Sequence, residues 1–384
     1  MAGHTRRSLF QLAGAAALLR GQVVSAQQPA APPPQKKGGR GFGPQAGLAE
    51  PFPEVARRPT VSVIHGEDRR KNVHDSLVAI DKQILPGLKR RKFVAIKVNN
   101  VSTVNQLAAT HADSLRGILD YLTPRFKGPI KIVESSAGDT HQGFENFKYP
   151  EVVKEFSKHN VSLVDLNEDA RFELVALLDK DLHPVPCRLA KMLMDPDCFV
   201  IASSMLKTHN TAIATLTVKN MVLGAPLHQA PKETKRWNEK RKYHVGIRQT
   251  HYNMMLTMQK LNPQLGLAVI DGFEGMEGNG PSSGTPVASR IAIASTDYIA
   301  ADRVGIEAMS INPEWVGYLK YCGEMGLGQY DLSKIEVIGA SLADVKKPYR
   351  MHADIELELQ WQGPMTEVPQ NLGWIHAMGD YPLV

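Results

Sequence analysis

Two lysines and a histidine with the side-chain chemistry of an active site lie close together in the middle of the chain. Lys207 and His209 are two residues apart, and Lys219 follows ten residues later. A lysine beside another cation can have a lowered pKa, which makes it a nucleophile or a Schiff-base former. Two lysines and a histidine are equally suited to clamp a phosphate or a carboxylate. We take His209, Lys219 and Lys207 as candidate catalytic residues, and the residues alone leave both roles open.

A glycine-rich stretch follows Asp271 and offers a second kind of binding chemistry. It has five glycines in the thirteen positions from 272 to 284. Gly278 and Gly280 are expected to present backbone amides to an anion, whereas Asp271 and Glu274 are expected to supply oxygen ligands to Mg²⁺ or Ca²⁺. The spacing is not that of a dinucleotide-binding motif, because the third glycine is out of register and a strand follows. The cofactor is therefore unknown at this point, with a divalent metal as one alternative.

Polar side chains also collect just past four apolar runs that have the composition of buried strands. In an open parallel sheet the carboxyl ends of the strands face one crevice, where ligands bind. We therefore expect one cleft to collect side chains that are distant in the sequence, namely Lys97, Asn99, Ser135, Lys207, His209 and Asp271. The expected ligand is small and anionic, and its predicted binding residues are Lys97, Asn99, Ser135, Asn220, Gly278 and Gly280.

The elements that must position these residues alternate regularly along the chain. Apolar strands are predicted at 60–64, 93–98, 130–133, 161–164, 198–202 and 265–270. Helices are predicted between them at 73–85, 112–122 and 151–159, and a strand and two helices follow between 291 and 325. Further strands are expected at 335–338 and, from its alternating pattern, at 355–359. This order predicts a Rossmann-like α/β fold, in which a mostly parallel sheet has helices on both faces. It forms one domain or two lobes that divide near 170–195.

Charge and composition exclude several classes of protein. With 43% hydrophobic residues the chain has enough apolar surface to build a core. The net charge of +6 comes entirely from the first 58 residues, and the chain is neutral from residue 59 onward. A nucleic-acid partner is therefore not expected. The three isolated cysteines, Cys187, Cys198 and Cys322, cannot form a four-cysteine iron–sulfur site within the chain.

The first residues resemble an export signal. Arg6 and Arg7 precede a short apolar run, 12–19, and small residues lead to Ala26, a pattern similar to a twin-arginine signal peptide. The apolar run is far shorter than the roughly 20 residues that span a membrane. We predict a signal peptide at 1–26 with cleavage near Ala26, a periplasmic protein, and no transmembrane segment in the mature chain. The predicted domains are the signal, a Pro/Gly-rich tether at 27–58, an α/β domain at 59–340, and a C-terminal extension at 341–384 that packs on it.

Several of these segments together resemble the domain of unknown function 362 family. The matching segments occur in the family's order and cover roughly residues 60–330: 96–99, 205–209, 218–224, 271–284 and 297–302. The first departs from the family pattern, which has proline where Val98 stands. Many relatives resemble carriers of a ferredoxin-type cluster domain, for which this chain lacks the cysteines. The resemblance implies no reaction.

A more distant similarity concerns His209 and Lys219, whose spacing resembles that in the nickel-pincer lactate racemase family. That similarity implies Lys219 as the anchor of a nickel-bearing nucleotide and His209 as a metal ligand or proton carrier. The favoured hypothesis is an exported enzyme or cofactor protein that binds an anionic ligand in its cleft. The alternatives are a non-catalytic periplasmic binding protein and a distant relative of these racemases. The sequence does not decide whether the chain is an enzyme, nor its oligomeric state.

Overall fold

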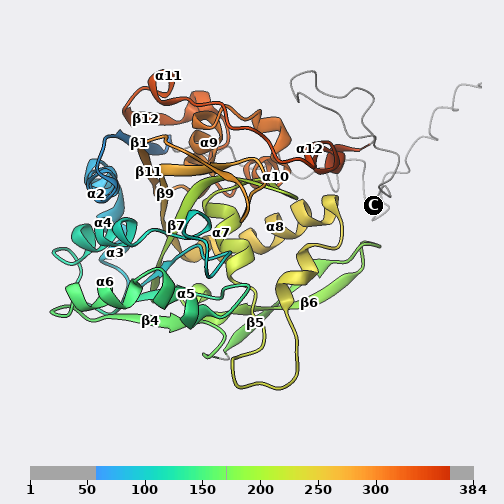
Figure 1. The fold of residues 1–384 in the computed structure, drawn as a ribbon, viewed down its shortest axis with the longest axis horizontal. Coiled ribbons are helices and arrows are strands. Elements are labelled where there is room, and N and C mark those ends of the chain that lie inside the picture. Colours follow the sequence, from blue (N-terminus) through green and yellow to red (C-terminus); the bar gives the residue numbers. More distant parts are fainter. Residues whose placement is uncertain (1–57, 170, 364–384) are drawn as a thin grey trace, which may run out of the picture. The chain divides into compact units, whose positions relative to one another are not determined.

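The computed structural model describes residues 58–169 and 171–363. The predicted signal peptide at 1–26 lies outside the described residues, and so does the predicted tether except for Arg58. The described residues belong to one compact unit, and a ten-stranded sheet forms its centre (Figure 1).

Eight strands of this sheet lie side by side in the order β12-β1-β11-β9-β7-β2-β3-β4, while the short strands β8 and β10 pair with β7 and β9. Among the eight, β11 alone runs antiparallel to its neighbours. The prediction of an α/β fold with a mostly parallel sheet is therefore confirmed. The strands are β1 (Thr60–His65), β2 (Phe93–Lys97), β3 (Ile130–Glu134), β4 (Val161–Asp165), β7 (Cys198–His209), β8 (Ile213–Thr215), β9 (Leu265–Glu277), β10 (Thr285–Val287), β11 (Ile291–Ser295) and β12 (Glu336–Gly339).

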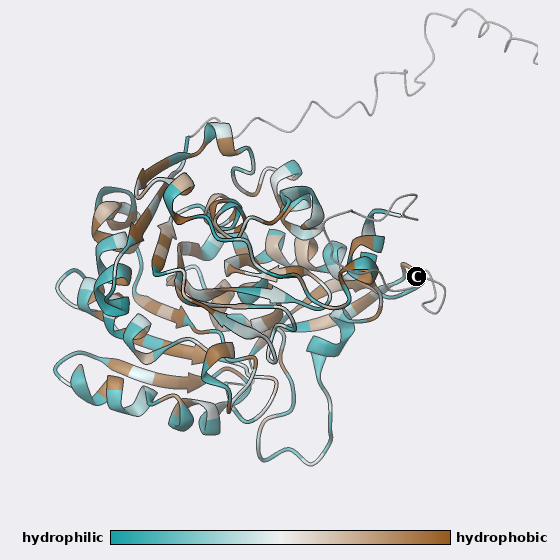
Figure 2. Cartoon of the chain, turned by 45° about the horizontal axis from the view of Figure 1, so that its top comes forward, coloured by the Kyte–Doolittle hydropathy of each residue, from teal (hydrophilic) through white to brown (hydrophobic). Residues whose placement is uncertain are grey.

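Helices cover both faces of the sheet. Successive side chains of a strand point to opposite faces, so each strand contributes residues to both cores. In β7, Val200 and Ala202 belong to the core beneath α7–α10, whereas Phe199 and Ile201 belong to the core beneath α2–α6. Figure 2 shows the hydrophobic residues concentrated along the strands and the hydrophilic ones on the outer helices and loops. The helices are α2 (Arg69–Ala79), α3 (Asp81–Leu88), α4 (Ala112–Leu122), α5 (Thr140–Asn146), α6 (Tyr149–Glu155), α7 (Thr217–Gly224), α8 (Ile247–Leu261), α9 (Tyr298–Ala308), α10 (Gly317–Glu324), α11 (Leu342–Val345) and α12 (Ile355–Glu358).

The two central strands are longer than the sequence pattern predicts. β7 continues beyond residue 202 to His209, and β9 continues beyond residue 270 to Glu277. Their extensions pair with each other and with β8 and β10. Lys207 and His209 were expected in a loop, but they lie on a strand that is buried along its whole length.

The prediction of a strand at 355–359 is wrong. These residues form α12 and the start of a short 3-10 helix, Leu359–Gln362. An alternating pattern of only five residues also places its two ends, Ile355 and Leu359, four positions apart on one side of a helix. Both are buried in the core that also contains α7–α10.

A hairpin that the sequence reading missed occupies the region of the expected lobe boundary. β5 (Phe172–Leu178) and β6 (Pro184–Ala190) form a separate two-stranded antiparallel sheet. Leu177, Cys187 and Leu189 from this hairpin belong to the same core as β7 and α8. Within the described residues, the division into lobes near 170–195 is therefore not found.

The longest helix, α8, has 15 residues. No helix in the described part of the chain combines the length and the apolar character that crossing a bilayer requires.

Candidate functional site

The chain changes its direction of travel across the sheet at β2. From β2 it adds β3 and β4 on one side, and it then returns to place β7 on the other side. In open α/β sheets, ligands bind at the carboxyl ends of the strands beside such a switch. Lys97 is the last residue of β2, and Lys207 and His209 lie in the last three positions of β7. The fold therefore places three predicted site residues at the expected position.

A buried ion pair forms the base of this site. Lys97 Nζ lies 2.6 Å from Glu134 Oε1, and it donates hydrogen bonds to Val98 O at 2.6 Å and to Asn220 Oδ1 at 3.2 Å. The two side chains are 1% and 3% exposed. A Cβ atom at Gly224 would lie 2.3 Å from Lys97 Nζ, so a larger residue there would displace the lysine end from its contacts with Glu134 and Asn220. Burial lowers the pKa of Lys97, and the Glu134 carboxylate opposes that shift.

Lys207 is held by neutral oxygens instead of a carboxylate. Its Nζ donates to Asn99 Oδ1 at 2.5 Å and to Ala108 O at 3.0 Å, and Asn99 Nδ2 in turn donates to Asn220 Oδ1 at 3.1 Å. Within the described ranges the third N–H of Lys207 has no acceptor. Burial lowers the pKa of Lys207 to about 7, with the Glu134 charge acting against the shift and the Lys97 charge adding to it.

Helix α7, which carries Lys219, is held at both of its ends. At its start, Asp302 accepts hydrogen bonds from Thr217 N at 2.8 Å and from Val218 N at 2.9 Å. At its end, Lys240 Nζ donates to two carbonyl oxygens, at 2.9 Å and 2.8 Å. A carboxylate at the first turn and an amine at the last turn both complement the orientation of the peptide dipoles.

The Asp302 carboxylate is itself positioned by helix α9, whose first residue, Tyr298, is anchored in the sheet. The Tyr298 hydroxyl lies 3.0 Å from Val200 O and 2.8 Å from Leu267 O, and it accepts a hydrogen bond from Ala202 N at 3.1 Å. The register of β7 against β9 shifts at this point, so the hydroxyl bridges backbone groups that the ladder leaves apart. The 297–302 segment therefore connects the sheet to the helix that carries Lys219.

Lys219 differs from the other buried lysines because it has no acceptor. Its side chain is 3% exposed, and within residues 58–169 and 171–363 its Nζ makes no hydrogen bond or ion pair. The polar atoms that are sealed from solvent without a partner include Ser203 Oγ and Thr215 Oγ1 but not Lys219 Nζ, so part of that small exposure lies at its reactive end. Burial and the nearby charges of Lys207 and Lys240 all lower its pKa well below the ordinary value.

His209, whose pKa is influenced by the charge of Lys219, has a defined tautomer. Its Nδ1 accepts hydrogen bonds from Thr211 N at 3.0 Å and from Ala212 N at 3.3 Å, so the proton of the neutral ring is on Nε2. Burial lowers the pKa of His209 well below its usual range, and Lys219 is the strongest of the charges that add to this shift. The exposed His244 ring lies nearly parallel to it, with ring centroids 6.4 Å apart and an interplanar angle of 15°.

The described lysines of this cluster outnumber their counter-ions. Lys97, Lys207, Lys219 and Lys240 are all buried or nearly so, and within the described residues Glu134 is the only carboxylate in contact with any of them. Burial lowers the pKa of Lys240 to about 7. Among the described residues, the site is therefore a cluster of amines and imidazoles with one carboxylate in contact with it.

The chain matches the model of a family described as "Domain of unknown function (DUF362)" over residues 94–307. It belongs to this family. The region of the chain that matches DUF362 contains the lysine cluster and the residues that hold it, from Lys97 and Glu134 to Lys219, Lys240 and Asp302. It ends before α11 and α12, so His352, which also influences the pKa of His209, lies outside it.

Two further comparisons add no function to the DUF362 assignment. A crystal structure of a Thermotoga maritima protein, determined by the Northeast Structural Genomics Consortium, aligns with a TM-score of 0.35 and 11% sequence identity. The alignment covers 72% of this chain and 62% of that protein, which is less than two thirds of its length. No curated protein matches the chain.

The predicted amide donors of the glycine-rich stretch are used within the protein. Gly278 N donates to Arg350 O at 2.7 Å, and Gly280 N donates to Gly278 O at 2.7 Å. A Cβ atom at Gly280 would lie 2.0 Å from Thr208 O. Glycine is thus required for close packing against the end of β7, and the structure gives these two amides no free direction toward an anion.

The structure does not bring the predicted metal ligands Asp271 and Glu274 together. Asp271 is buried, with Oδ2 3.2 Å from Arg69 Nε and Oδ1 accepting from Phe273 N at 3.0 Å, whereas Glu274 is exposed. They are three positions apart on β9 and so point to opposite faces of the sheet. Among the described residues, three potential metal ligands do approach one another on the turn between β5 and β6, but exposed acidic groups of this kind are common without an ion: Asp179, Asp181 and His183.

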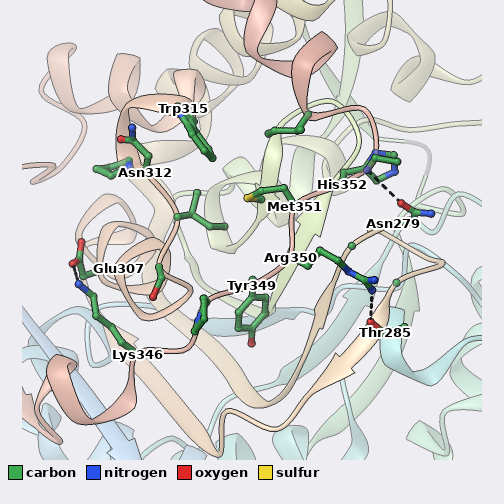
Figure 3. A pocket seen from close by; sticks show the side chains of 18 of the residues that line it. Asn279, Thr285, Glu307, Asn312, Trp315, Lys346, Tyr349, Arg350, Met351 and His352 are labelled. Carbon is green, nitrogen blue, oxygen red and sulfur yellow. Dashed lines mark hydrogen bonds and ion pairs between the residues drawn. The ribbon is translucent and has the colours of Figure 1, made fainter. Parts of the chain in front are cut away.

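A cavity of about 1070 Å³ lies beside the cluster. Its lining includes Gly278, whose carbonyl oxygen accepts a hydrogen bond from Thr208 Oγ1 at 2.8 Å, and His352. Figure 3 shows the side chains of Trp315 and Met351 in the same cavity. Lys207, Lys219 and His209 are not part of the lining. The cavity is therefore a neighbour of the amine cluster and not the cluster itself.

The remaining predicted binding residues, Ser135, Asn99 and Asn220, already use their side chains in hydrogen bonds within the protein. Ser135 Oγ lies 3.1 Å from Asn167 Oδ1 and 3.2 Å from Pro226 O, and its single proton can go to either acceptor. Asn99 and Asn220 hold the lysines. The sequence reading missed the roles of the partners that the fold supplies: Glu134, Lys240, His244, Asp302 and His352. Lys240 occurs in a run of charged residues at 232–242, a pattern typical of an exposed loop, so its burial left no signal in the sequence.

Proposed function

We propose that this protein binds a small anionic ligand at the carboxyl ends of β2 and β7, and that Lys207, Lys219 and His209 face that ligand. The excess of buried amines over carboxylates is the observation that carries this proposal. Of the four lysines in the cluster, Glu134 contacts Lys97 only, so Lys207 and Lys219 have no negative partner of their own among the described residues.

The argument rests on the cost of burying charge. An ammonium group without a counter-ion is expensive in a protein interior, and it either loses its proton or acquires a negative partner. A carboxylate or phosphate beside Lys207 would receive its third N–H and would raise its pKa from about 7. The position at the switch of strand order favours the same conclusion, because such positions bind ligands in many unrelated α/β proteins.

Calorimetric titration of the purified protein with oxalate and with inorganic phosphate tests this proposal. We expect saturable binding of at least one of these anions, and we expect Lys207→Met to weaken it by tenfold or more. Lys92→Met is the matched control, since Lys92 is 78% exposed and its ion pair with Asp197 lies on the surface. Absence of binding to the wild-type protein, or an equal loss in both variants, would contradict the proposal.

The same site distinguishes an enzyme from a binding protein. We propose that it is catalytic, because the fixed tautomer of His209 presents an Nε2–H group, and Lys219, whose charge acts on His209, has no partner among the described residues. A non-catalytic binding protein would retain its anion affinity and show no chemical change of any ligand. Whether the protein is an enzyme or a binding protein, His209→Ala is expected to leave its affinity for the anion within a fewfold of wild type. If the protein is an enzyme, the same substitution is expected to abolish turnover of the ligand.

We also propose that the protein is exported, on the basis of the Arg6–Arg7 pair and the apolar run that follows it. Replacement of both arginines by lysine tests this idea in cells that have a twin-arginine system. The wild-type chain is expected in the periplasmic fraction in a shortened form, and the variant is expected to be retained at full length. Equal distribution of the two would refute the export proposal without affecting the site.

A further inference from the structure

The surroundings of Lys219 distinguish it from the three other lysines of the cluster, of which Lys97 and Lys207 are buried and Lys240 is partly buried. Lys97 has acceptors for all three of its N–H groups, and Lys207 and Lys240 each have two. Lys219 Nζ has none within the described residues. An amine that is not held by an acceptor is free to use its lone pair on a ligand.

The neighbours of Lys219 favour the neutral form that has such a lone pair. Amines become nucleophilic in proteins through desolvation or through an adjacent cation, and Lys219 has both, since it is buried and the charge of Lys207 acts on it. No carboxylate raises its pKa. An ordinary exposed lysine with a pKa near 10.4 has only about one neutral amine in 2,500 at pH 7.

The remaining groups define the kind of molecule that the amine would meet. The unused N–H of Lys207 suits a carboxylate, and the Nε2–H of His209 suits a carbonyl oxygen as a hydrogen-bond donor. Lys207 and His209 are both close enough to Lys219 for their charges to interact with it. A small 2-oxo acid carries both groups on adjacent carbons.

We propose that Lys219 forms an imine with the carbonyl carbon of a small 2-oxo acid whose carboxylate pairs with Lys207. This inference rests on the proposed anion site. The Lys219 lone pair attacks the carbonyl carbon, the π electrons move to oxygen, and one N–H proton passes to that oxygen. When the C=N bond forms, the hydroxyl leaves with the second N–H proton as water. Amine and ketone give imine and water, so no oxidant or reductant takes part, and His209 orients the carbonyl oxygen.

Trapping with pyruvate and sodium borohydride tests the inference, because the hydride reduces an imine to a stable secondary amine. We expect intact-mass analysis to show one reduced pyruvyl group per chain at pH 7, and peptide mapping to place it on Lys219. The labelling rate of Lys219 should exceed that of exposed lysines such as Lys92 by about 100-fold or more, given the difference in neutral fraction. Lys219→Arg, which keeps a cation but has no comparable nucleophile, should give no adduct, while Lys92→Met should label as wild type does.

Other outcomes overturn the imine and separate its failure from that of the anion site. Labels spread over exposed lysines without enrichment at Lys219 would overturn it, and so would a covalent group already present on Lys219 before pyruvate is added. Binding of oxalate that depends on Lys207, together with no pyruvate adduct, would overturn the imine and leave the anion site standing. Absence of oxalate binding would remove both. The peptide map uses wild-type protein, so the answer does not depend on the folding of a variant.

Discussion

Replacement of Glu134 by glutamine is the sharpest test of the charge arrangement, because Glu134 is the one carboxylate among the described residues that contacts the lysine cluster. Glu134 Oε1 lies 2.6 Å from Lys97 Nζ, and the carboxylate also accepts hydrogen bonds from Ser135 N at 2.7 Å and from Asn100 N at 2.8 Å. The two charged side chains are 1% and 3% exposed. Breaking a buried pair by removing one partner costs about 3–5 kcal/mol.

Proton release from Lys97 sets a ceiling on that cost. At pH 7 the native variant can carry a neutral Lys97 for about 4.6 kcal/mol relative to an unfolded lysine with a pKa near 10.4, at about 1.36 kcal/mol per pH unit. Between pH 7 and about 10.4 the lysine is protonated in the unfolded chain and neutral in the native variant, so the unfolded state binds more protons. The free-energy cost of a neutral Lys97 therefore falls as pH rises. It is about 1.9 kcal/mol at pH 9. We expect Glu134→Gln to lower the free energy of unfolding by about 3–4 kcal/mol at pH 7 and by less than about 2 kcal/mol at pH 9.

Equilibrium urea unfolding at the two pH values measures this effect. Glu155→Gln is the control, because Glu155 pairs with Arg116 at the surface and is 43% exposed, where such a pair contributes less than about 1 kcal/mol. Addition of Lys97→Met to Glu134→Gln should restore most of the stability, since a neutral pair replaces the unpaired charge. A loss below about 1 kcal/mol at pH 7, or a loss that does not shrink at pH 9, would show that the pair is not the buried charge pair described.

Three further predictions concern the same region and the thiols. Gly224→Ala should cost about 1–3 kcal/mol in urea unfolding because its Cβ would lie 2.3 Å from Lys97 Nζ, whereas Gly138→Ala, with Thr103 Oγ1 at 3.4 Å, should be close to neutral. Affinity for oxalate should be constant below about pH 6 and fall by up to tenfold per pH unit above 7, because the anion needs the protonated form of Lys207, whose pKa is about 7. Calorimetry at pH 6, 7.5 and 9 measures this dependence, and an affinity that does not change with pH would contradict it. The buried thiols, whose pKa values are raised by burial, should resist a thiol reagent in native protein and react fully in urea: Cys187, Cys198 and Cys322.

The sequence was sufficient for the elements that are both apolar and regular. Strands such as β2 and β3 are continuous apolar runs, and their bounds agree with the pattern to within a residue. The extensions of β7 and β9 were not predictable, because Lys207, His209 and Gly272 are poor strand residues that owe their extended conformation to pairing with β8, β10 and β11. Five alternating residues at 355–359 were too few to distinguish a strand from one turn of helix.

The candidate site was predictable in its position and only partly in its membership. The rule that strand ends meet at one edge led us to group Lys97, Lys207 and His209, which do lie at the ends of β2 and β7. It also led us to group Asp271 with them, although Asp271 forms an ion pair with Arg69 of α2. Glu134 and Lys240 enter the site through tertiary contacts, and neither residue type nor spacing marks them in the sequence.

The fastening of α7 at both ends has a consequence for the timing of recognition. Asp302 accepts hydrogen bonds from the backbone where this short helix begins, and Lys240 donates hydrogen bonds to backbone carbonyls where it ends. The helix backbone therefore has little freedom to rotate or fray, and the position of Lys219 on it would be set before the proposed ligand binds. A receptor that is already set gives up little conformational entropy on association. The rate of binding should thus be set by the entry of the proposed ligand into its site, without a slow rearrangement of α7 afterwards.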